Sequence, residues 1–296
     1  MAAIRRTRAD LVLDAANYAI MTIAVVVVIY PLYFIVIGSF SDPEAIYLGK
    51  AWLFPQNPSL EGYQRMFRDA TIWIGYRNSL VYAILGTVIN VSLTLPAAYA
   101  LSRKDLAGRN KLMLLITFTM LFNGGLIPTY ILVRDLGIYN TIWAMVLPNA
   151  VGVWNVIIAR TYFQTTIPDD LLDSSVIDGC SNAGFFLRIV LPLSGALVAI
   201  MVLFYAVGHW NAFFNALIYL QSETLYPLQL VLRNILIANQ VSDGMLSDLE
   251  SVALQQRLAD LIKYGVIIVA SLPLLVLYPF LQKYFVKGVM IGAIKG

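Results

Sequence analysis

Four carboxylates lie within ten residues of a sequence that is only 12% charged: Asp169, Asp170, Asp173 and Asp178. Clustered carboxylates can help to hold a metal ion or exchange protons in catalysis. The rest of the chain supplies neither chemistry, because it has one histidine, one cysteine and no H-E-x-x-H motif. It also lacks the G-x-x-x-x-G-K-[ST] motif that cradles the phosphates of ATP. We therefore predict no catalytic residue and no metal ligand, and we expect the cluster to face water or another protein.

The composition places these acids in an integral membrane protein. Hydrophobic residues make up 59% of the 296 residues, and the mean hydropathy is +0.75. Apolar runs reach about twenty residues, the length that crosses a bilayer as a helix. A net charge of +3 is too small to indicate nucleic-acid binding, and the single cysteine, Cys180, excludes an intrachain disulfide.

Six apolar segments are predicted to span the membrane as helices. They lie near residues 15–40, 73–101, 112–132, 138–158, 194–219 and 261–281. We expect a short segment, 1–14, followed by a single all-α membrane domain, 15–296. In the third segment, Asn123-Gly124-Gly125 and Pro128 are predicted to interrupt the helix, which is tolerated only where protein or water binds the freed backbone groups.

The basic residues predict how this domain is oriented. The side that holds both termini and the 161–193 loop carries twelve Lys and Arg residues outside the spans, and the opposite side carries six. Positively charged loops remain in the cytoplasm. Both termini and the 161–193 loop are therefore predicted to be cytoplasmic, and the loops 41–72 and 222–260 extracytoplasmic.

The 161–193 loop has the pattern of two short helices joined by a glycine turn. Pro168 suits the first turn of a helix, and Gly179 accepts the left-handed conformation that commonly ends one. Ser181 can cap the second helix, and Pro192 ends or bends it. The second helix would share one apolar face among Phe185, Phe186, Ile189 and Val190. Such an element can dock in a groove of a soluble partner.

The spacing within this loop resembles that of the permease subunits of ATP-binding-cassette (ABC) importers. Their cytoplasmic loop follows the pattern E-A-A, three residues, G, nine residues, I-x-L-P. Here Asp173-Ser174-Ser175 takes the E-A-A place, Gly179 follows after three residues, and Ile189-x-Leu191-Pro192 follows after nine more. The acid is shorter than in the family and two hydroxyls are added, so the fine contacts differ. In the family, this loop is the coupling helix, which sits in a cleft of the ATPase subunit.

The resemblance implies the fold of a type I ABC importer permease, with six transmembrane helices and a cytoplasmic coupling helix within residues 169–190. It assigns ATPase coupling to nine residues of the loop: Asp173, Ser174, Ser175, Asp178, Gly179, Phe186, Ile189, Leu191 and Pro192.

Other stretches are similar to the maltose-type carbohydrate permeases within that family. Residues 210–213 (WNAF) resemble the W-N-x-F motif of the group, and residues 284–288 (YFVKG) with 292–296 (GAIKG) resemble its C-terminal ending. Residues 123–130 (NGGLIPTY) resemble a subgroup that includes the second permease of the alginate importer. The candidate residues along a substrate path are Asn123, Tyr130, His209, Trp210 and Asn211.

Several of these candidates also have a purely structural interpretation. Asn123-Gly124-Gly125 and Pro128 can form a kink that packs against a neighbouring helix, since glycine permits close helix packing. His209 can bind a sugar or satisfy a hydrogen bond inside the bundle, and we favour the second role. The acids of residues 222–260 can form a solvated face or contact a sugar-binding protein.

The resemblance implies a non-catalytic permease subunit in the inner membrane of a bacterium, which moves an oligosaccharide or polysaccharide into the cytoplasm by alternating access. The implied partners are a second permease, two ATPase subunits that bind ATP and Mg²⁺, and an extracytoplasmic sugar-binding protein. The chain itself is expected to bind no cofactor. The alternatives are a secondary transporter or channel that ATP does not drive, and a membrane-embedded enzyme. No predicted span carries the acid or base pairs of a proton-coupled carrier.

Overall fold

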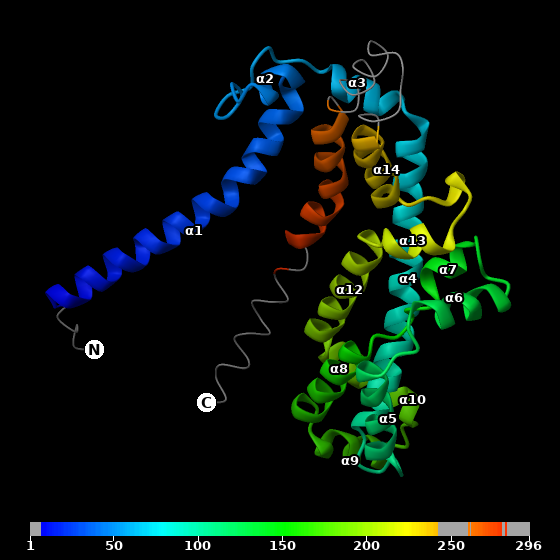
Figure 1. Cartoon of the computed structure of the whole chain (residues 1–296). Coiled ribbons are helices and arrows are strands. Elements are labelled where there is room, and N and C mark those ends of the chain that lie inside the picture. Colours follow the sequence, from blue (N-terminus) through cyan, green and yellow to red (C-terminus); the bar gives the residue numbers. More distant parts are fainter. Residues whose placement is uncertain (1–6, 242–259, 261, 280–281, 283–296) are drawn as a thin grey trace. The chain divides into compact units, whose positions relative to one another are not determined.

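A computed structural model describes residues 7–241, 260, 262–279 and 282 of the chain. Every regular element in this part is helical (Figure 1). Contacts divide the chain into two compact units, Met1–Asp69 with Asn234–Val269 and Ala70–Arg233 with Ala270–Gly296. This division does not test the prediction of a single membrane domain over residues 15–296, which stays a prediction.

The first unit contains α1 (Arg8–Phe40), α2 (Pro43–Tyr47) and α3 (Glu61–Arg68). Helix α1 begins seven residues earlier than the predicted span, because Thr7 and Asp10 form a capping box. The Asp10 N–H donates to Thr7 Oγ1 (3.2 Å), and the Thr7 N–H donates to Asp10 Oδ2 (2.7 Å). Helices α2 and α3 lie in the predicted 41–72 loop.

The second unit is built around α4 (Ala70–Ser102), which packs against α8 (Val153–Thr166) and α12 (Gly195–Trp210) (Figure 1). At Gly86, α4 lies directly against the His209 side chain of α12. A Cβ atom at Gly86 would lie only 2.3 Å from Nε2 of His209, so the position requires glycine. Small residues at helix interfaces permit this kind of close packing.

The third predicted span is broken where the sequence indicates. Helix α5 (Arg109–Leu121) and α6 (Leu126–Asp135) meet at an angle of 110°. Between them, Asn123 Oδ1 accepts a hydrogen bond from the Gly125 N–H (3.0 Å), and Gly125 adopts a φ of +84°. The predicted interruption of this span is therefore confirmed.

The fourth predicted span, residues 138–158, does not form one helix. It contains α7 (Ile142–Val146) and the start of α8, joined by residues 147–152. The break follows from Pro148, which has no N–H to donate. Two side chains replace the lost helical bonds: Asn90 Nδ2 donates to the Asn149 carbonyl (3.1 Å), and the Gly152 N–H donates to the Tyr205 hydroxyl (3.1 Å).

The fifth predicted span is also interrupted. Helix α12 ends at Trp210, and α13 (Phe214–Tyr219) begins after a three-residue break. Residues 222–241 of the predicted 222–260 loop contain the 3-10 turn η2 (Glu223–Leu225) and α14 (Leu228–Val241). Residues 242–259 of that loop lie outside the described part of the chain.

The last described helix is Ile262–Pro279, within the sixth predicted span. Among the described residues, three helices are long and apolar enough to cross a membrane, or five if each bent helix pair is one span. The count of six spans therefore stays a prediction.

Candidate functional site

The predicted coupling loop forms a helical hairpin. Its first arm is α9 (Asp169–Ile177), with Pro168 at the N-cap and two aspartates in the first turn, where they complement the positive end of the helix dipole. The arm ends at Gly179, whose N–H donates to the Val176 carbonyl (3.0 Å). Gly179 has a φ of +73°, and a Cβ atom there would meet nothing within 4 Å. The turn therefore requires the left-handed backbone of glycine rather than the space that glycine leaves.

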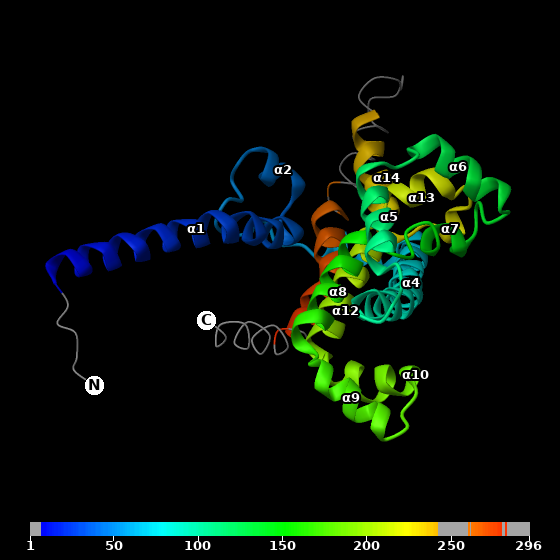
Figure 2. The same ribbon diagram turned by 90° about the horizontal axis from the view of Figure 1, so that it is seen from below.

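The second arm is α10 (Asn182–Phe185), followed by one π-helical turn, η1 (Phe186–Val190), and by α11 (Leu191–Leu193). Ser181 Oγ accepts the Gly184 N–H (3.1 Å), which confirms the predicted cap. The arm then bends by 85° into α12 at Ser194, two residues after Pro192. Figure 2 shows α9 and α10 well apart from α6, α7 and α13 of the same unit.

The second arm holds the apolar residues of the predicted coupling set, and most of them are buried or partly buried. Phe185, Phe186 and Val190 are buried in one core cluster, and Ile189 and Leu191 pack against it. Pro192 is exposed. The second arm is thus anchored to the membrane domain through the apolar face that the sequence predicts.

The first arm presents a surface, here called the α9 tip. Its members are all exposed: Asp173, Ser174, Val176, Ile177, Asp178 and Gly179. Val176 is 61% exposed, and Ile177 is 86% exposed. Sequence reasoning missed Ile177. Its apolar neighbours at helical spacing gave no sign that it would point outward.

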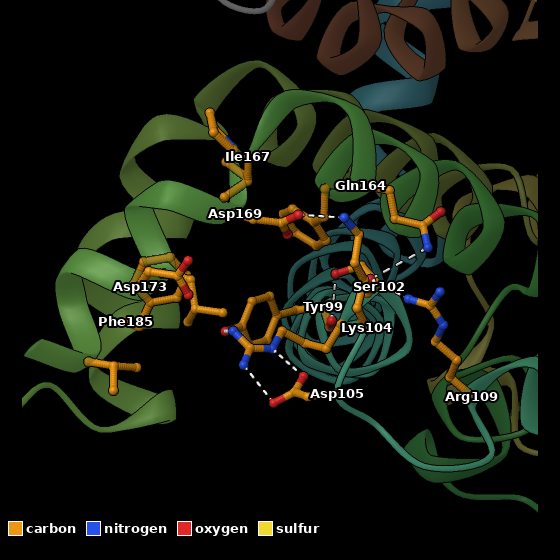
Figure 3. A pocket seen from close by; sticks show the side chains of 15 residues that line it. Tyr99, Ser102, Lys104, Asp105, Arg109, Gln164, Ile167, Asp169, Asp173 and Phe185 are labelled. Atoms are coloured by element: carbon orange, nitrogen blue, oxygen red, sulfur yellow. Dashed lines mark hydrogen bonds and ion pairs between the residues drawn. The ribbon is translucent and has the colours of Figure 1, made fainter.

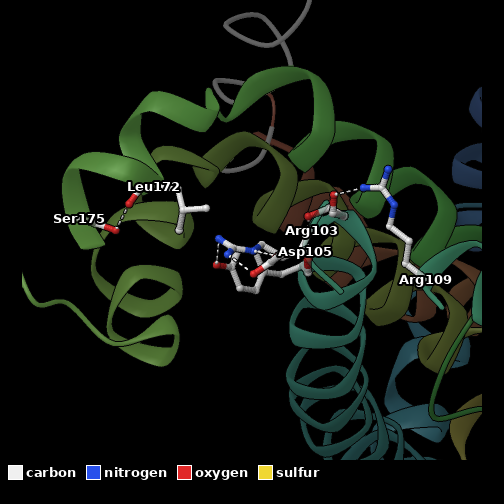
Figure 4. Close-up of polar contacts among 7 residues, drawn as sticks. Arg103, Asp105, Arg109, Leu172 and Ser175 are labelled. Atoms are coloured by element: carbon white, nitrogen blue, oxygen red, sulfur yellow. Dashed lines mark hydrogen bonds and ion pairs between the residues drawn. The ribbon is translucent and has the colours of Figure 1, made fainter. Parts of the chain in front are cut away.

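The serines in the E-A-A place bond within α9. Ser174 Oγ donates to the Asp170 carbonyl (2.9 Å), and Ser175 Oγ donates to the Leu172 carbonyl (2.7 Å; Figure 4). Ser175 is also buried. Their hydrogens are therefore directed into the helix, and Asp173 is the exposed charged group of this triplet.

Tyr99, near the end of α4, lies against the hairpin. Its ring centroid is 4.9 Å from that of Phe186 and 6.2 Å from that of Phe163 on α8. The Arg103 guanidinium lies 6.0 Å from the Tyr99 ring centroid. The second arm of the hairpin therefore packs directly on α4, the central helix of this unit.

A cavity of about 470 Å³ separates α9 from the end of α4 (Figure 3). Lys104 forms an ion pair with Asp169 across it. Arg103 donates from Nε and Nη2 to the two carboxylate oxygens of Asp105, at 2.9 and 2.7 Å (Figure 4). These hydrogen bonds lower the pKa of the Asp105 carboxyl and raise the pKa of Arg103.

The predicted substrate-path residues occupy separate places. Asn123 is exposed in the α5–α6 break, and the Tyr130 ring packs on Tyr139 (5.6 Å) and Tyr219 (6.4 Å). Asn211 is exposed at the end of α12 and donates to the Val207 carbonyl (3.0 Å). The structure does not bring these residues together around one cavity.

His209 and Trp210 are both buried inside the unit. His209 Nε2 is 3.3 Å from Asn90 Oδ1, and Trp210 Nε1 donates to the Ala270 carbonyl (2.9 Å). These partners fit the structural role that we favoured for His209. In the described part of the chain, no group of three or more His, Cys, Asp or Glu side chains could hold a metal ion.

Long apolar helices, two bent helix pairs and an exposed helical hairpin indicate an integral membrane protein. The chain belongs to the family described as "Binding-protein-dependent transport system inner membrane component", which matches residues 70–291. The chain is therefore an integral protein of the bacterial inner membrane. The prediction that it is not an enzyme is confirmed, since the family consists of non-catalytic membrane components.

Two proteins of Bacillus subtilis (strain 168) are similar over nearly their whole length. The "Polygalacturonan/rhamnogalacturonan transport system permease protein YtcP" is 38% identical over 283 residues, covering 96% of this chain and 98% of the relative. "Protein LplC" is 38% identical over 290 residues, covering 98% and 97%.

A solved structure has the same architecture. It is a chain of a bacterial ABC transporter involved in the import of the acidic polysaccharide alginate, with a TM-score of 0.86 and 27% identity over 96% of this chain and 100% of that one. This likeness confirms the predicted all-α fold of a type I ABC permease.

Proposed function

We propose that this chain is a permease subunit of an ATP-driven importer that moves an oligosaccharide or polysaccharide into the cytoplasm by alternating access. The observation that carries the proposal is the helical hairpin of α9 and α10, with one arm anchored in the membrane domain and the α9 tip exposed. Family membership supports the role as a permease. The substrate class follows from relatives whose names specify polygalacturonan, rhamnogalacturonan and alginate transport.

The α9 tip is suited to a groove in an ATPase subunit. Val176 and Ile177 offer apolar surface for burial, and Asp173 and Asp178 flank it with charges that fix its orientation. When two ATPases close on ATP, the docked hairpin moves, and α4 and α12 follow because Tyr99 and Phe186 are packed together. Sugar binding and ATP binding then shift the balance between inward-open and outward-open states.

The proposed complex contains this chain, a second permease, two ATPases and an extracytoplasmic sugar-binding protein. ATP and Mg²⁺ belong to the ATPases, and this chain holds no cofactor. In this proposal both termini and the hairpin lie in the cytoplasm, together with the ATPases. The excess of Lys and Arg on that side supports this orientation.

The test compares two variants of the complex reconstituted in vesicles, Gly179→Val and Gly179→Asn. The left-handed conformation is strained for valine but accessible to asparagine. We expect Gly179→Val to reduce sugar uptake per ATP hydrolysed about tenfold, a loss of roughly 1.4 kcal/mol in coupling. We expect Gly179→Asn to stay within about twofold of wild type. Wild-type uptake per ATP in both variants would remove the hairpin from the coupling path.

The same vesicles separate the proposal from its main alternative. A secondary transporter would continue to accumulate sugar when the partner ATPases are inactivated by substitution of their phosphate-binding lysine. We expect accumulation to stop. Continued accumulation would assign the chain to a transporter that ATP does not drive.

A further inference from the structure

A second cavity, of about 690 Å³, opens on α8, α12 and residues 274–278 of the helix Ile262–Pro279, and all the residues that line it belong to the second unit. Three aromatic side chains border it and are well exposed: Trp154 (62%), Phe204 (45%) and Tyr278 (56%). Asn155, on the first turn of α8, lies among them. None of these four residues is among the substrate-path candidates that the sequence suggested.

The polar groups of this cavity indicate that it does not face lipid. Neither the Asn155 amide nor the Tyr278 hydroxyl has a hydrogen-bond partner in the described part of the chain, although both belong to segments predicted to span the membrane. An unpaired amide in hydrocarbon costs several kcal/mol. The face that carries Asn155 must therefore meet water, a polar ligand or another protein.

Carbohydrate has the chemistry that fits these groups. One face of a pyranose ring is made of C–H groups that pack on aromatic rings, and its edge carries hydroxyls that both donate and accept hydrogen bonds. The Asn155 amide offers two donors and an acceptor, and the Tyr278 hydroxyl offers one of each. The remaining lining residues, Leu203, Val207 and Leu274, are all apolar and shield these polar contacts from competing groups.

A third cavity lacks these features. It has about 560 Å³ and lies between α4, α12 and the helix Ile262–Pro279, lined mainly by aliphatic side chains such as Leu80, Ile84, Val88 and Leu277. Among the described residues that line this cavity, Trp210 is the only aromatic one. The indole N–H of Trp210 already donates to the Ala270 carbonyl. It offers sugar neither an exposed ring nor a free amide.

We propose that Trp154, Asn155, Phe204 and Tyr278 form a sugar-contact subsite on the translocation path of this chain. The inference rests on the proposed import function and names where the substrate touches this subunit. The aromatic rings stack on a sugar ring as the substrate moves along the path, while Asn155 and Tyr278 form hydrogen bonds with the sugar hydroxyls. A few such contacts hold the sugar long enough for the permease to switch and leave it free to move on.

The first test is solvent access. The Asn155→Cys substitution is made in the complete complex after the native cysteine has been removed by Cys180→Ser. We expect the new thiol to react with a water-soluble maleimide. We expect oligosaccharides of polygalacturonan or alginate to slow that reaction at least threefold. Val27→Cys on the apolar helix α1 is the unreactive control, and Lys50→Cys in the 41–72 loop is the reactive one. An unreactive Asn155→Cys beside a reactive Lys50→Cys would overturn the subsite.

The second test is transport. We expect Trp154→Leu, and separately Asn155→Ala, to lower oligosaccharide uptake per ATP hydrolysed roughly fivefold, the effect of one lost hydrogen bond or ring contact. Trp143→Leu on α7, an exposed tryptophan outside the cavity, should leave it unchanged. If the wild-type complex imports neither oligosaccharide, the proposed substrate class fails. If it imports one and both cavity variants match wild type, the subsite alone is overturned.

Discussion

At the scale of single residues, the Arg103–Asp105 pair makes the stability of the chain just after α4 depend on pH. Arg103 lowers the pKa of Asp105, so the folded protein keeps this carboxylate ionised at pH values where the unfolded chain is protonated. Its contribution to stability is complete above the ordinary aspartate pKa of about 4 and is lost as the pH falls through the lowered pKa of the folded state.

We expect Asp105→Asn to lower the thermal unfolding midpoint at pH 7 and to have a smaller effect at pH 3. The Asp105 side chain is 64% exposed, so the contribution should stay below about 1 kcal/mol. Unfolding curves for wild type and variant at both pH values measure the difference. An equal difference at pH 7 and pH 3 would show that the ion pair is not its source.

The sequence predicts the position and conformation of Gly179 but not the exposure of its neighbour Ile177. Its place after α9 and its left-handed conformation follow from spacing and from the conformational freedom of glycine, and the structure confirms both. The outward direction of Ile177 does not follow from the sequence. Leu171, Leu172, Val176 and Ile177 are all apolar, but of these four only Leu172 packs against the buried cluster that contains Phe185 and Phe186.

At the scale of elements, close packing of α4 on α12 depends on Gly86. The His209 ring occupies the space that a side chain would need, and its Nε2 lies beside Asn90 on α4. We expect Gly86→Ala to destabilise the protein by about 1–3 kcal/mol through overpacking, measured as a lower unfolding midpoint in detergent.

Gly208 on α12 supplies the matched control for this prediction. A Cβ atom there meets nothing within 4 Å, so Gly208→Ala should be neutral or stabilising by up to about 1 kcal/mol, the gain in helix propensity. Adding His209→Ala to Gly86→Ala should recover part of the loss. Equal midpoints for the two glycine variants would mean that the helices do not meet at Gly86.

The breaks in the spans were predictable to different degrees. Asn123-Gly124-Gly125 concentrates residues that favour turns, and the 110° bend lies there. Pro148 and Asn149 lie in a mainly apolar segment, and mean hydropathy alone predicted that segment as one span. The break persists because Asn90 and Tyr205, distant in sequence, bind its backbone groups. The π-helical turn at Phe186–Val190 has no local sequence signal that we recognise.

At the scale of the whole molecule, composition is sufficient to assign a membrane protein, and motif spacing is sufficient to assign its family. Hydropathy locates apolar segments but does not show whether a broken helix pair crosses the bilayer or returns. The described helices contain two such pairs, α5 with α6 and the α10–α11 segment with α12. The number of spans and their orientation therefore need an experiment on the intact membrane.

Orientation can be measured in spheroplasts with single cysteines in the Cys180→Ser background. If both termini are cytoplasmic, Lys50→Cys lies outside and should react with an impermeant maleimide in intact spheroplasts. Arg8→Cys, at the start of α1, should react only after the membrane is permeabilised. The expected asymmetry comes from the excess of Lys and Arg on the terminal side, since moving positive charge across the membrane opposes insertion. Reaction of Arg8→Cys in intact spheroplasts would invert the orientation and place the α9 tip on the side of the membrane where no ATPase could reach it.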